Sequence, residues 1–382
     1  MLKVAIVGCG KIADAHASQI QRIAGCEIRG ACDREELMAK QLCQRFGVSR
    51  HFSDLSRLLH EIRPDVVHVT TPPGNHFEIA EECLLQGSHV YVEKPFTVNT
   101  TEAERLIGLA KQRGLKITVG HDDQFRHAAR RMRALVKAGY LGGGPVHMES
   151  YYCYEMAETS DYVQALLGDK HHWVRKLPGQ LLQNIISHGI ARIAEFLVTD
   201  APQVIAHGFV SPLLRKLGEE QIIDELRVII SEERRVTAYF TFSSQMQPSL
   251  HQFRIYGPRN GLLLDQDNET LIKLRGARYK SYLEHFLSPL VFARQYIGNT
   301  AQNVQAFLSN DFHMKSGMKY LIESFYRSIV EGTPLPISYR EILLTSRIMD
   351  SIFEQIRPLD RLAGDFGTPE HANQCLDGLI SN

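Results

Sequence analysis

Short apolar runs alternate with amphipathic stretches over the first 120 residues of the chain. The runs are rich in β-branched residues, which is typical of strands covered on both faces. They predict strands at Leu2–Val7, Glu27–Cys32, Asp65–Thr70, His89–Val92 and Lys116–Val119. Between them, apolar side chains at helical spacing predict helices at Lys11–Ile23, Arg34–Phe46, His76–Gln86 and Thr101–Arg113. This alternation predicts an α/β fold with a doubly wound parallel sheet, which we assign to residues 1–121.

The pattern changes after residue 121, because strand-like segments now follow one another, mostly without helices between them. They predict strands at Pro145–Glu155, Gln203–Val210, Gln221–Ser231, Val236–Ser243, His251–Tyr256 and Leu262–Asp265. Apolar stripes predict two later helices, at Gly317–Gly332 and Ile342–Ile356. We therefore expect residues 122–358 to form an α+β domain with a largely antiparallel, open sheet. Residues 359–382 show little pattern and are expected to form a C-terminal tail.

One segment, residues 282–308, carries many large apolar side chains. The first interpretation is one or two helices packed into the protein. A subunit interface is the second interpretation, and contact with a membrane surface is the third. The sequence leaves these three alternatives open.

Composition narrows the class of protein. The chain has 43 Lys and Arg against 43 Asp and Glu, a balance that disfavours a nucleic-acid-binding surface. Seven scattered cysteines without metal-ligand spacing favour buried thiols in a reducing cytoplasm. No signal segment and no apolar run long enough to span a membrane is evident, so we expect a cytoplasmic protein. The 17 histidines do not form the pattern of a metal site.

A glycine-rich turn, Gly8-Cys9-Gly10-Lys11-Ile12-Ala13, follows the first predicted strand and opens the first predicted helix. The first glycine permits a tight turn, and the second lets the backbone approach a pyrophosphate at the positive end of the helix. Asp33 follows the second predicted strand, at the place where the dinucleotide-binding pattern has an acidic residue. Its carboxylate would bond the ribose hydroxyls and repel a 2′-phosphate, which favours NAD over NADP. We expect cofactor contacts from Gly8, Gly10, Lys11, Ile12, Asp33 and Arg34.

A second motif, Glu93-Lys94-Pro95, follows the apolar run His89–Val92. It places a lysine at the carboxyl end of a parallel strand, the side of such sheets on which ligands collect. An ammonium group there can hydrogen-bond a carbinol oxygen and favour its alkoxide character as hydride departs. Lys94 is therefore the first candidate catalytic residue. Glu93 is expected to hold the lysine or to contact the cofactor ribose.

Together with Thr71-Pro72-Pro73-Gly74-Asn75-His76, these motifs resemble the glucose-fructose oxidoreductase/inositol dehydrogenase/MocA (Gfo/Idh/MocA) family. Three later segments resemble that family as well, so the resemblance covers most of the chain: Trp173–Leu197, Tyr256–Asp265 and Phe325–Pro336. The resemblance implies a two-domain NAD(P)-dependent oxidoreductase that acts on a sugar or cyclitol. It also implies a homo-oligomer, a dimer or tetramer, in which a second subunit covers the open sheet.

The resemblance implies roles for individual residues. Thr71 and Pro72 would lie under the nicotinamide end of the cofactor, and His76 would be either a cofactor contact or a residue that starts the next helix. In the family, an active-site helix carries an Asp and, four residues later, a His. Here these positions are Asn184 and His188. We expect His188 to act as general acid or base, oriented by an amide that lacks the charge of the family's carboxylate.

Two further positions depart from the family pattern. Ala191 stands where an acidic residue is common, and His121–Phe125 replaces an Asn and Arg before the phenylalanine. Within that segment, Asp122 is a candidate to hydrogen-bond a substrate hydroxyl. Tyr152 and Trp173 are candidates to stack on a sugar ring, although aromatic residues in strands more often belong to the core.

The sequence thus predicts an NAD-dependent oxidoreductase whose partner is a small carbohydrate. Hydride would pass between the nicotinamide and a secondary hydroxyl of a sugar, a sugar derivative or a cyclitol, nucleotide-linked or free. A second interpretation is an enzyme that oxidises a glycoside transiently so that elimination or hydrolysis can follow. A third is an NAD-bound sensor or inactive partner subunit, which the missing acidic residues suggest.

Overall fold

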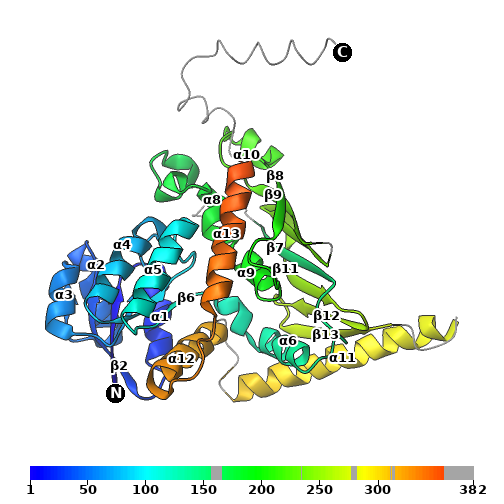
Figure 1. Ribbon diagram of the computed structural model, residues 1–382, viewed down its shortest axis with the longest axis horizontal. Helices are drawn as coiled ribbons and strands as arrows, with labels where there is room; N and C mark the ends of the chain where they lie inside the picture. The colour runs from blue at the N-terminus through cyan, green and yellow to red at the C-terminus, as the bar shows by residue number, and fades with distance from the viewer. Residues whose placement is uncertain (156–165, 234, 277–281, 310, 312–314, 357–382) are drawn as a thin grey trace, which may run out of the picture.

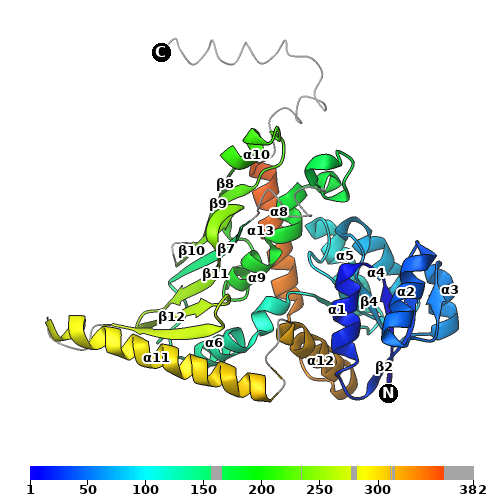
Figure 2. The same cartoon turned by 180° about the vertical axis from the view of Figure 1, so that it is seen from behind.

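The computed structural model describes residues 1–155, 166–233, 235–276, 282–309, 311 and 315–356. Two sheets form its frame, and helix α13 stands between them (Figures 1 and 2). The tail expected at residues 359–382 lies outside the described residues.

Six parallel strands form the first sheet in the order β3-β2-β1-β4-β5-β6. Their bounds are β1 Leu2–Val7, β2 Cys26–Cys32, β3 His51–Phe52, β4 Val66–Val69, β5 His89–Val92 and β6 Ile117–Val119. The strand order reverses between β1 and β4, and such a reversal opens a crevice at the carboxyl ends of the strands. The expected doubly wound parallel sheet is therefore confirmed.

Helices cover both faces of this sheet (Figure 1). They are α1 Lys11–Ile20, α2 Glu36–Phe46, α3 Leu55–Ile62, α4 His76–Leu85 and α5 Thr100–Gln112, with short 3-10 turns η1 Pro73–Asn75 and η2 Asp122–Phe125. Side-chain caps fix two of the helix starts, because Asp54 accepts from the backbone N–H of Arg57 and Asn99 accepts from that of Glu102.

The second sheet has seven strands in the order β13-β12-β11-β7-β10-β9-β8. Its strands are β7 His147–Glu155, β8 Gln203–Phe209, β9 Glu225–Glu232, β10 Val236–Ser243, β11 Gln245–Tyr256, β12 Asn260–Asp265 and β13 Thr270–Arg275. The pair β7–β10 is parallel and the other pairs are antiparallel. Buried and exposed side chains alternate along β10, so one face packs inward and one lies open. This confirms the expected open, largely antiparallel sheet.

Further helices line the inner face and the edge of this sheet. They are α6 His127–Lys137, η3 Trp173–Lys176, α8 Gln180–Ile185, α9 Ser187–Ala194, α10 Pro212–Lys216, α11 Tyr282–Leu308 and α13 Tyr339–Ile356. Helix α12 Ser316–Glu331 packs against the first sheet instead.

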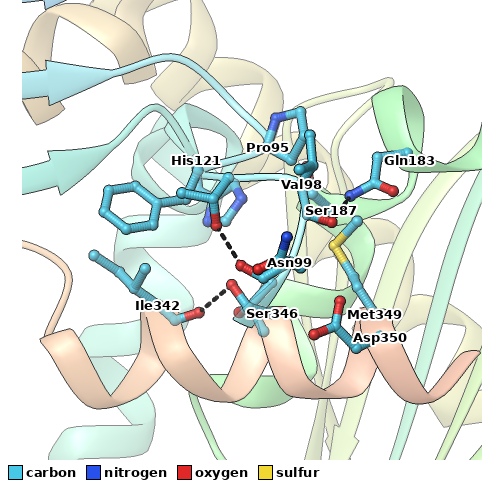
Figure 3. Close-up of a pocket in the computed structure, with 13 residues that line it drawn as sticks. Pro95, Val98, Asn99, His121, Gln183, Ser187, Ile342, Ser346, Met349 and Asp350 are labelled. Carbon is cyan, nitrogen blue, oxygen red and sulfur yellow. Dashed lines mark hydrogen bonds between the residues drawn. The ribbon is translucent and has the colours of Figure 1, made fainter. Parts of the chain in front are cut away.

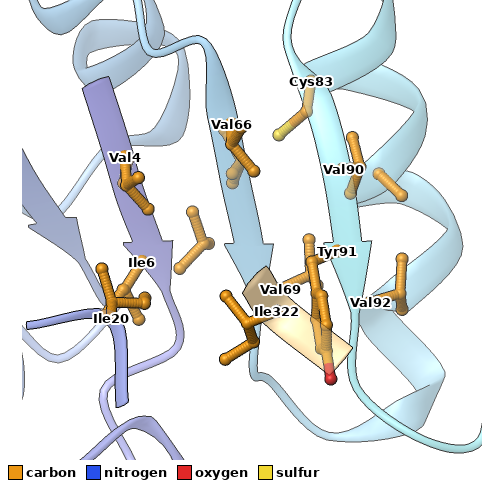
Figure 4. Packing of buried hydrophobic residues seen from close by; sticks show 14 of the residues in the cluster. Val4, Ile6, Ile20, Val66, Val69, Cys83, Val90, Tyr91, Val92 and Ile322 are labelled. Atoms are coloured by element: carbon orange, nitrogen blue, oxygen red, sulfur yellow. The ribbon is translucent and has the colours of Figure 1, made fainter. Parts of the chain in front are cut away.

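The two sheets have separate cores, and the last helices join them. Figure 4 shows Ile322, which belongs to α12, near Val69 and Tyr91 of the first core. Helix α13 contributes Ile342 to this core and several later side chains to the second one, including Ile348, Ile352 and Phe353. The segment 315–356 therefore ties the two halves together although it follows both in the sequence.

Several elements differ from the sequence-based expectation. Helix α2 begins at Glu36 rather than Arg34, because the Asp33 carboxylate accepts the backbone N–H of Glu35 and turns the chain first. Strand β3 has two residues, too few to leave a periodic signal. Helix α6 was not predicted, since its sequence is rich in arginine and its buried side chains are small apart from Met132.

Residues 282–308 form one helix, α11, but the interpretation that it is packed into the protein is wrong. Asn299 is its one buried residue. Its large apolar side chains are mostly exposed to solvent.

Candidate active site

The glycine-rich turn between β1 and α1 lies against the end of β4. Gly8 has a φ of 93°, and a Cβ added there would lie 2.7 Å from the backbone nitrogen of Thr71. The Thr70 hydroxyl donates to the carbonyl of Gly8 at 2.6 Å. Glycine is therefore required at position 8 by both backbone conformation and close approach.

The same turn has the features that a dinucleotide needs. Gly10 precedes α1 without a side-chain cap, and a Cβ added there would meet no atom within 4 Å. The space beside this helix start is thus open to a phosphate group. Lys11 is exposed and Ile12 half-buried at the start of the helix.

Asp33 closes β2 beside that turn. Its Oδ2 atom accepts the backbone N–H of Cys9 at 2.6 Å, which holds the carboxylate at the rim of the turn. The neighbouring Arg34 is exposed. These residues fit a bound NAD, with the open turn for its pyrophosphate and the carboxylate for its ribose.

The segment after β4 is fixed by a buried histidine. His76 is fully buried, and its ring nitrogens each lie 2.8 Å from a backbone carbonyl, those of Thr71 and Pro95. The imidazole therefore links the loop that carries Thr71 and Pro72 to the loop that follows Lys94. Both ring nitrogens are engaged in this link.

A buried hydrogen-bonded chain starts at Glu93. Its carboxylate accepts from His16 Nε2 at 2.8 Å, His16 Nδ1 lies 2.8 Å from His68 Nδ1, and His68 Nε2 lies 2.8 Å from the Tyr326 hydroxyl. Burial opposes ionisation of Glu93, but the hydrogen bond from His16 and the charges of His16 and Lys94 outweigh it and lower its pKa to about 2. An ionised carboxylate thus lies directly beside Lys94.

Lys94 reaches from the first half of the molecule to the second. Its ammonium donates to the backbone carbonyl of Asn184 at 2.8 Å. Burial lowers the pKa of Lys94, an effect that the charges of Glu93, Asp122 and Asp123 oppose. An ammonium group has three donors, so this contact leaves others for a ligand.

The loop after Lys94 is held between helices of the second half. Figure 3 shows Pro95, Val98 and Asn99 beside Gln183 and Ser187 on one side and α13 on the other. The Gln183 amide donates to the carbonyl of Val98 at 3.0 Å. The position of Lys94 thus depends on packing between the two halves.

His188 lies opposite, between two carboxylates that do not come from its own helix. Its Nε2 atom is 4.0 Å from Asp122 Oδ1, and its Nδ1 atom is 3.8 Å from Asp123 Oδ2. Both aspartates belong to η2, which follows β6. Asn184, expected to orient the ring, precedes a break between α8 and α9, and its backbone carbonyl accepts a hydrogen bond from Lys94.

The two carboxylates differ strongly in their affinity for protons. Burial and the charge of Asp123 raise the pKa of Asp122 to about 7. Burial also works against ionisation of Asp123, but the charges of His188 and Arg192 outweigh it and hold its pKa well below the usual range. Burial lowers the pKa of His188 to about 4, against the opposing charge of Asp123. At neutral pH the imidazole is therefore uncharged beside an ionised Asp123.

Asp123 is fixed by two further side chains. The Tyr152 hydroxyl donates to its Oδ2 atom at 3.0 Å, and an Arg192 nitrogen lies 3.4 Å from the same oxygen. The ring of Tyr152 also stacks on His188, with centroids 5.8 Å apart. Both the hydroxyl and the ring of Tyr152 thus contact residues of this network. Trp173, by contrast, packs in a small separate cluster around Val174 and Leu181.

The structure brings together Lys94, Glu93, Asp122, Tyr152 and His188, and it adds three residues that the sequence reasoning missed. These are Asp123, Arg192 and His121, whose ring lies 5.7 Å from that of His188. A usable signal existed, because η2 follows β6 just as Lys94 follows β5, and the carboxyl ends of parallel strands meet at one edge. The family pattern predicts a partner for His188 at Asn184, on the same stretch of helix, and therefore does not point to Asp123 after β6.

Among the described residues, Asp122, Asp123 and His188 lie close enough to share a metal ion, with ligand atoms within 4.8 Å of one another. The positive charge of Arg192 beside Asp123 offsets the negative charge that would attract a cation. We assign no metal to this cluster.

Comparison with known proteins relates the first third of the chain to a family. A family model described as the oxidoreductase family with an NAD-binding Rossmann fold matches residues 2–121. The UDP-N-acetylglucosamine 3-dehydrogenase of Acidithiobacillus ferrooxidans is 32% identical over 39% of the chain and 44% of that enzyme. The chain thus spans less than half the length of this relative. The myo-inositol 2-dehydrogenase of Thermotoga maritima is 20% identical over 83% of the chain and 89% of that enzyme.

Solved structures share the whole fold. The WlbA dehydrogenase of Bordetella pertussis, solved with NADH and UDP-GlcNAcA, superposes with a TM-score of 0.73 at 14% identity. That superposition covers 93% of the chain and 95% of WlbA. The fold therefore extends beyond the segment that the family model matches. Residues 2–121 thus match the NAD-binding Rossmann fold of the Gfo/Idh/MocA oxidoreductase family, and the whole chain shares its fold with solved dehydrogenases.

Proposed function

We propose that the protein is an NAD-dependent oxidoreductase that oxidises a secondary hydroxyl of a sugar, a sugar derivative or a cyclitol. The observation that carries the proposal is that Lys94 binds the backbone carbonyl of Asn184, four residues before His188, at the carboxyl edge of the sheet that also carries the open glycine-rich turn. A cation and a neutral base at one edge are what removal of a proton and a hydride from an alcohol requires.

Lys94 is the group that stabilises the substrate oxygen. Its ammonium is held by the Asn184 carbonyl and balanced by the ionised Glu93, so its position and charge are both fixed. A hydrogen bond from this ammonium to the carbinol oxygen stabilises the alkoxide more than the alcohol, which lowers the barrier. Bound NAD supplies the hydride acceptor for this oxidation.

His188 is the group that receives the hydroxyl proton. It is neutral at physiological pH, so its ring can accept a proton. Asp123 faces its Nδ1 atom and stabilises the imidazolium that forms, while Asp122 faces Nε2. Asp123 thus takes the part that the resemblance assigns to an Asp at position 184.

The curated relatives suggest the substrate class. They include dehydrogenases of UDP-N-acetylglucosamine, of myo-inositol and, in Escherichia coli K12, of a D-glucoside. All three names describe oxidation of a ring alcohol. Asp122 and the Tyr152–Asp123 pair supply the acceptors that a polyhydroxylated ring needs.

The test is the Lys94→Ala variant, assayed for NADH formation on a panel of UDP-sugars, glycosides and cyclitols. We expect kcat to fall by about 100-fold or more, because a group that stabilises the transition state is lost. NAD affinity, measured by calorimetry, should change little. Full turnover in Lys94→Ala would refute the assignment.

Lys40→Ala is the matched control, because Lys40 is an exposed lysine of the same domain. This variant should retain the turnover of the unmodified protein. Product formation without net NADH would favour transient oxidation of a glycoside. NAD binding without turnover on any member of the panel would favour a sensor or an inactive partner subunit.

A further inference from the structure

Helix α11 is attached to the rest of the protein by amide side chains rather than by its apolar residues. The Asn299 amide pairs with both the N–H and the carbonyl of Leu271 on edge strand β13, at 2.9 and 3.1 Å. Gln295, one turn earlier, does the same with Lys273 at 2.8 and 3.2 Å. The helix therefore occupies the free hydrogen-bonding groups of the sheet edge and is held there in a defined orientation. Figures 1 and 2 show it extending beyond the sheet at its N-terminal end.

The exposed apolar residues of α11 follow a seven-residue repeat. Leu283, Leu290, Ile297 and Val304 occupy one position of the repeat, and a second set stands three residues after each of them: Phe286, Ala293, Thr300 and Phe307. All eight are exposed, and Ile297 at the centre has 71% of its surface in solvent. Two apolar positions separated in this way are the pattern by which one helix packs along another.

The part of the repeat from Phe286 to Phe307 is approximately symmetric about Ile297. Moving outward from Ile297 in either direction, the side chains are small, then aliphatic, then aromatic: Ala293 and Thr300, Leu290 and Val304, Phe286 and Phe307. A two-fold axis at Ile297 would place each aromatic residue beside its counterpart at the other end of a second, antiparallel α11. A closed two-fold contact of this kind uses the same surface on both copies.

The exposed area is sufficient for such a contact. Three flanking apolar residues, Tyr282, Tyr296 and Leu308, are exposed together with the repeat. With about 200 Å² for each aromatic side chain and somewhat less for each aliphatic one, their exposed area is roughly 1,000 Å² per chain. A standard stable interface buries about 800 Å² per partner.

Charge also favours a second copy over a membrane surface. The helix contains Glu284, His285 and Arg294 as its titratable groups apart from tyrosine, so it lacks the basic face typical of a helix that lies on a membrane. Among the described helices, none has both the length and the apolarity to cross a bilayer. A protein interface is depleted in charge and rich in aromatic residues, as this surface is.

We propose that α11 forms a homodimer interface by antiparallel pairing with α11 of a second copy, with the two-fold axis at Ile297. The first test is the mass of the full chain by light scattering or sedimentation. The double variant Leu290→Glu/Ile297→Glu should halve the mass of the unmodified protein, because it places four carboxylates at the centre of the seam. Gln302→Glu/Gln305→Glu adds the same charges to exposed positions outside the seam and should leave the mass unchanged.

The second test fixes the direction of pairing by oxidation of single cysteines in a Cys375→Ser background. Ile297→Cys should form a disulfide-linked dimer, whereas Leu283→Cys should not, because antiparallel pairing separates the two copies of residue 283. Coupling through residue 283 alone would overturn the antiparallel arrangement. An unmodified chain that is monomeric, or one that floats with phosphatidylcholine vesicles as a monomer, would overturn the proposal. So would an unchanged mass in the double glutamate variant.

Discussion

Asp123 is the main difference between the expected site and the observed one, because it lies beside His188 and was not expected there. Asn184 lacks the charge that would stabilise a protonated His188, and a loop from another part of the chain brings a carboxylate to the same imidazole. Tyr152 and Arg192 hold that carboxylate in its ionised form. The sequence showed the loss at position 184, but the replacement lies 61 residues away and is visible only where β6 meets α9.

Moving the carboxylate from position 123 to position 184 tests whether Asp123 acts on His188. Asp123→Asn removes the charge that raises the pKa of His188, so the acid limb of the pH profile of kcat/KM should move to lower pH. The maximal rate should fall by about 10-fold or more, because the base is weaker. Adding Asn184→Asp in the same protein should return both the limb and the rate toward those of the unmodified protein.

A thermal unfolding curve of each variant separates this effect from damage to the fold, since Arg192 loses a partner in Asp123→Asn. If the pH profile stays the same in Asp123→Asn, then Asp123 does not act through His188.

At the scale of elements, the site is an edge where several strands end. Gly8 follows β1, Asp33 follows β2, Thr71 follows β4 and Lys94 follows β5. The hydrogen-bonded chain from Glu93 to Tyr326 connects the same edge to α12. Strand β1 and strand β5 have the predicted bounds because their apolar runs end at clear boundaries, the turn glycine Gly8 and the charged Glu93. Short elements such as β3 carry too few residues for a period to appear.

The end of β2 carries a prediction about the cofactor. The Asp33 carboxylate is fixed by the backbone N–H groups of Cys9 and Glu35, so it cannot easily move away from a ribose phosphate. We expect kcat/KM with NAD to exceed that with NADP by about 10-fold or more, equivalent to about 1.4 kcal/mol. Asp33→Ser should reduce this preference.

Glu36→Ser, at an exposed carboxylate three residues later, should leave the ratio of the two cofactors unchanged. A preference for NADP in the unmodified protein would contradict this interpretation of Asp33.

At the scale of the whole molecule, α13 joins the two halves and carries a half-buried acid, Glu341. Burial and the charge of Glu195 raise the pKa of Glu341 to about 7, and its Oε2 atom has no hydrogen-bond partner. The unfolded chain therefore releases this proton near pH 4.5 and the folded chain near pH 7, so stability falls as pH rises between these values.

Glu341→Gln should remove this pH dependence. The variant should be more stable than the unmodified protein at pH 8, by about 1–3 kcal/mol in free energy of unfolding, and similar to it at pH 4.5. Denaturant unfolding at the two pH values measures the difference. Glu354→Gln, on the exposed side of the same helix, should show no such change; an equal slope with pH in Glu341→Gln and the unmodified protein would exclude the mechanism.

The sequence by itself determined the class of the fold, the cofactor turn and the position of Lys94. These features depend on local period, glycine and strand ends, which neighbouring residues are sufficient to specify. The resemblance added His188, whose motif was recognisable although its partner had changed.

Only the tertiary structure decided which carboxylates lie beside His188, what holds Glu93, and which side of α11 faces solvent. Each of these depends on contacts between residues far apart in the chain, and a period along one segment does not specify its partner. Helix α11 shows this most plainly. The same apolar stripe suits a packed helix or an interface, and the pairing of Gln295 and Asn299 with β13 determined that the stripe lies outside.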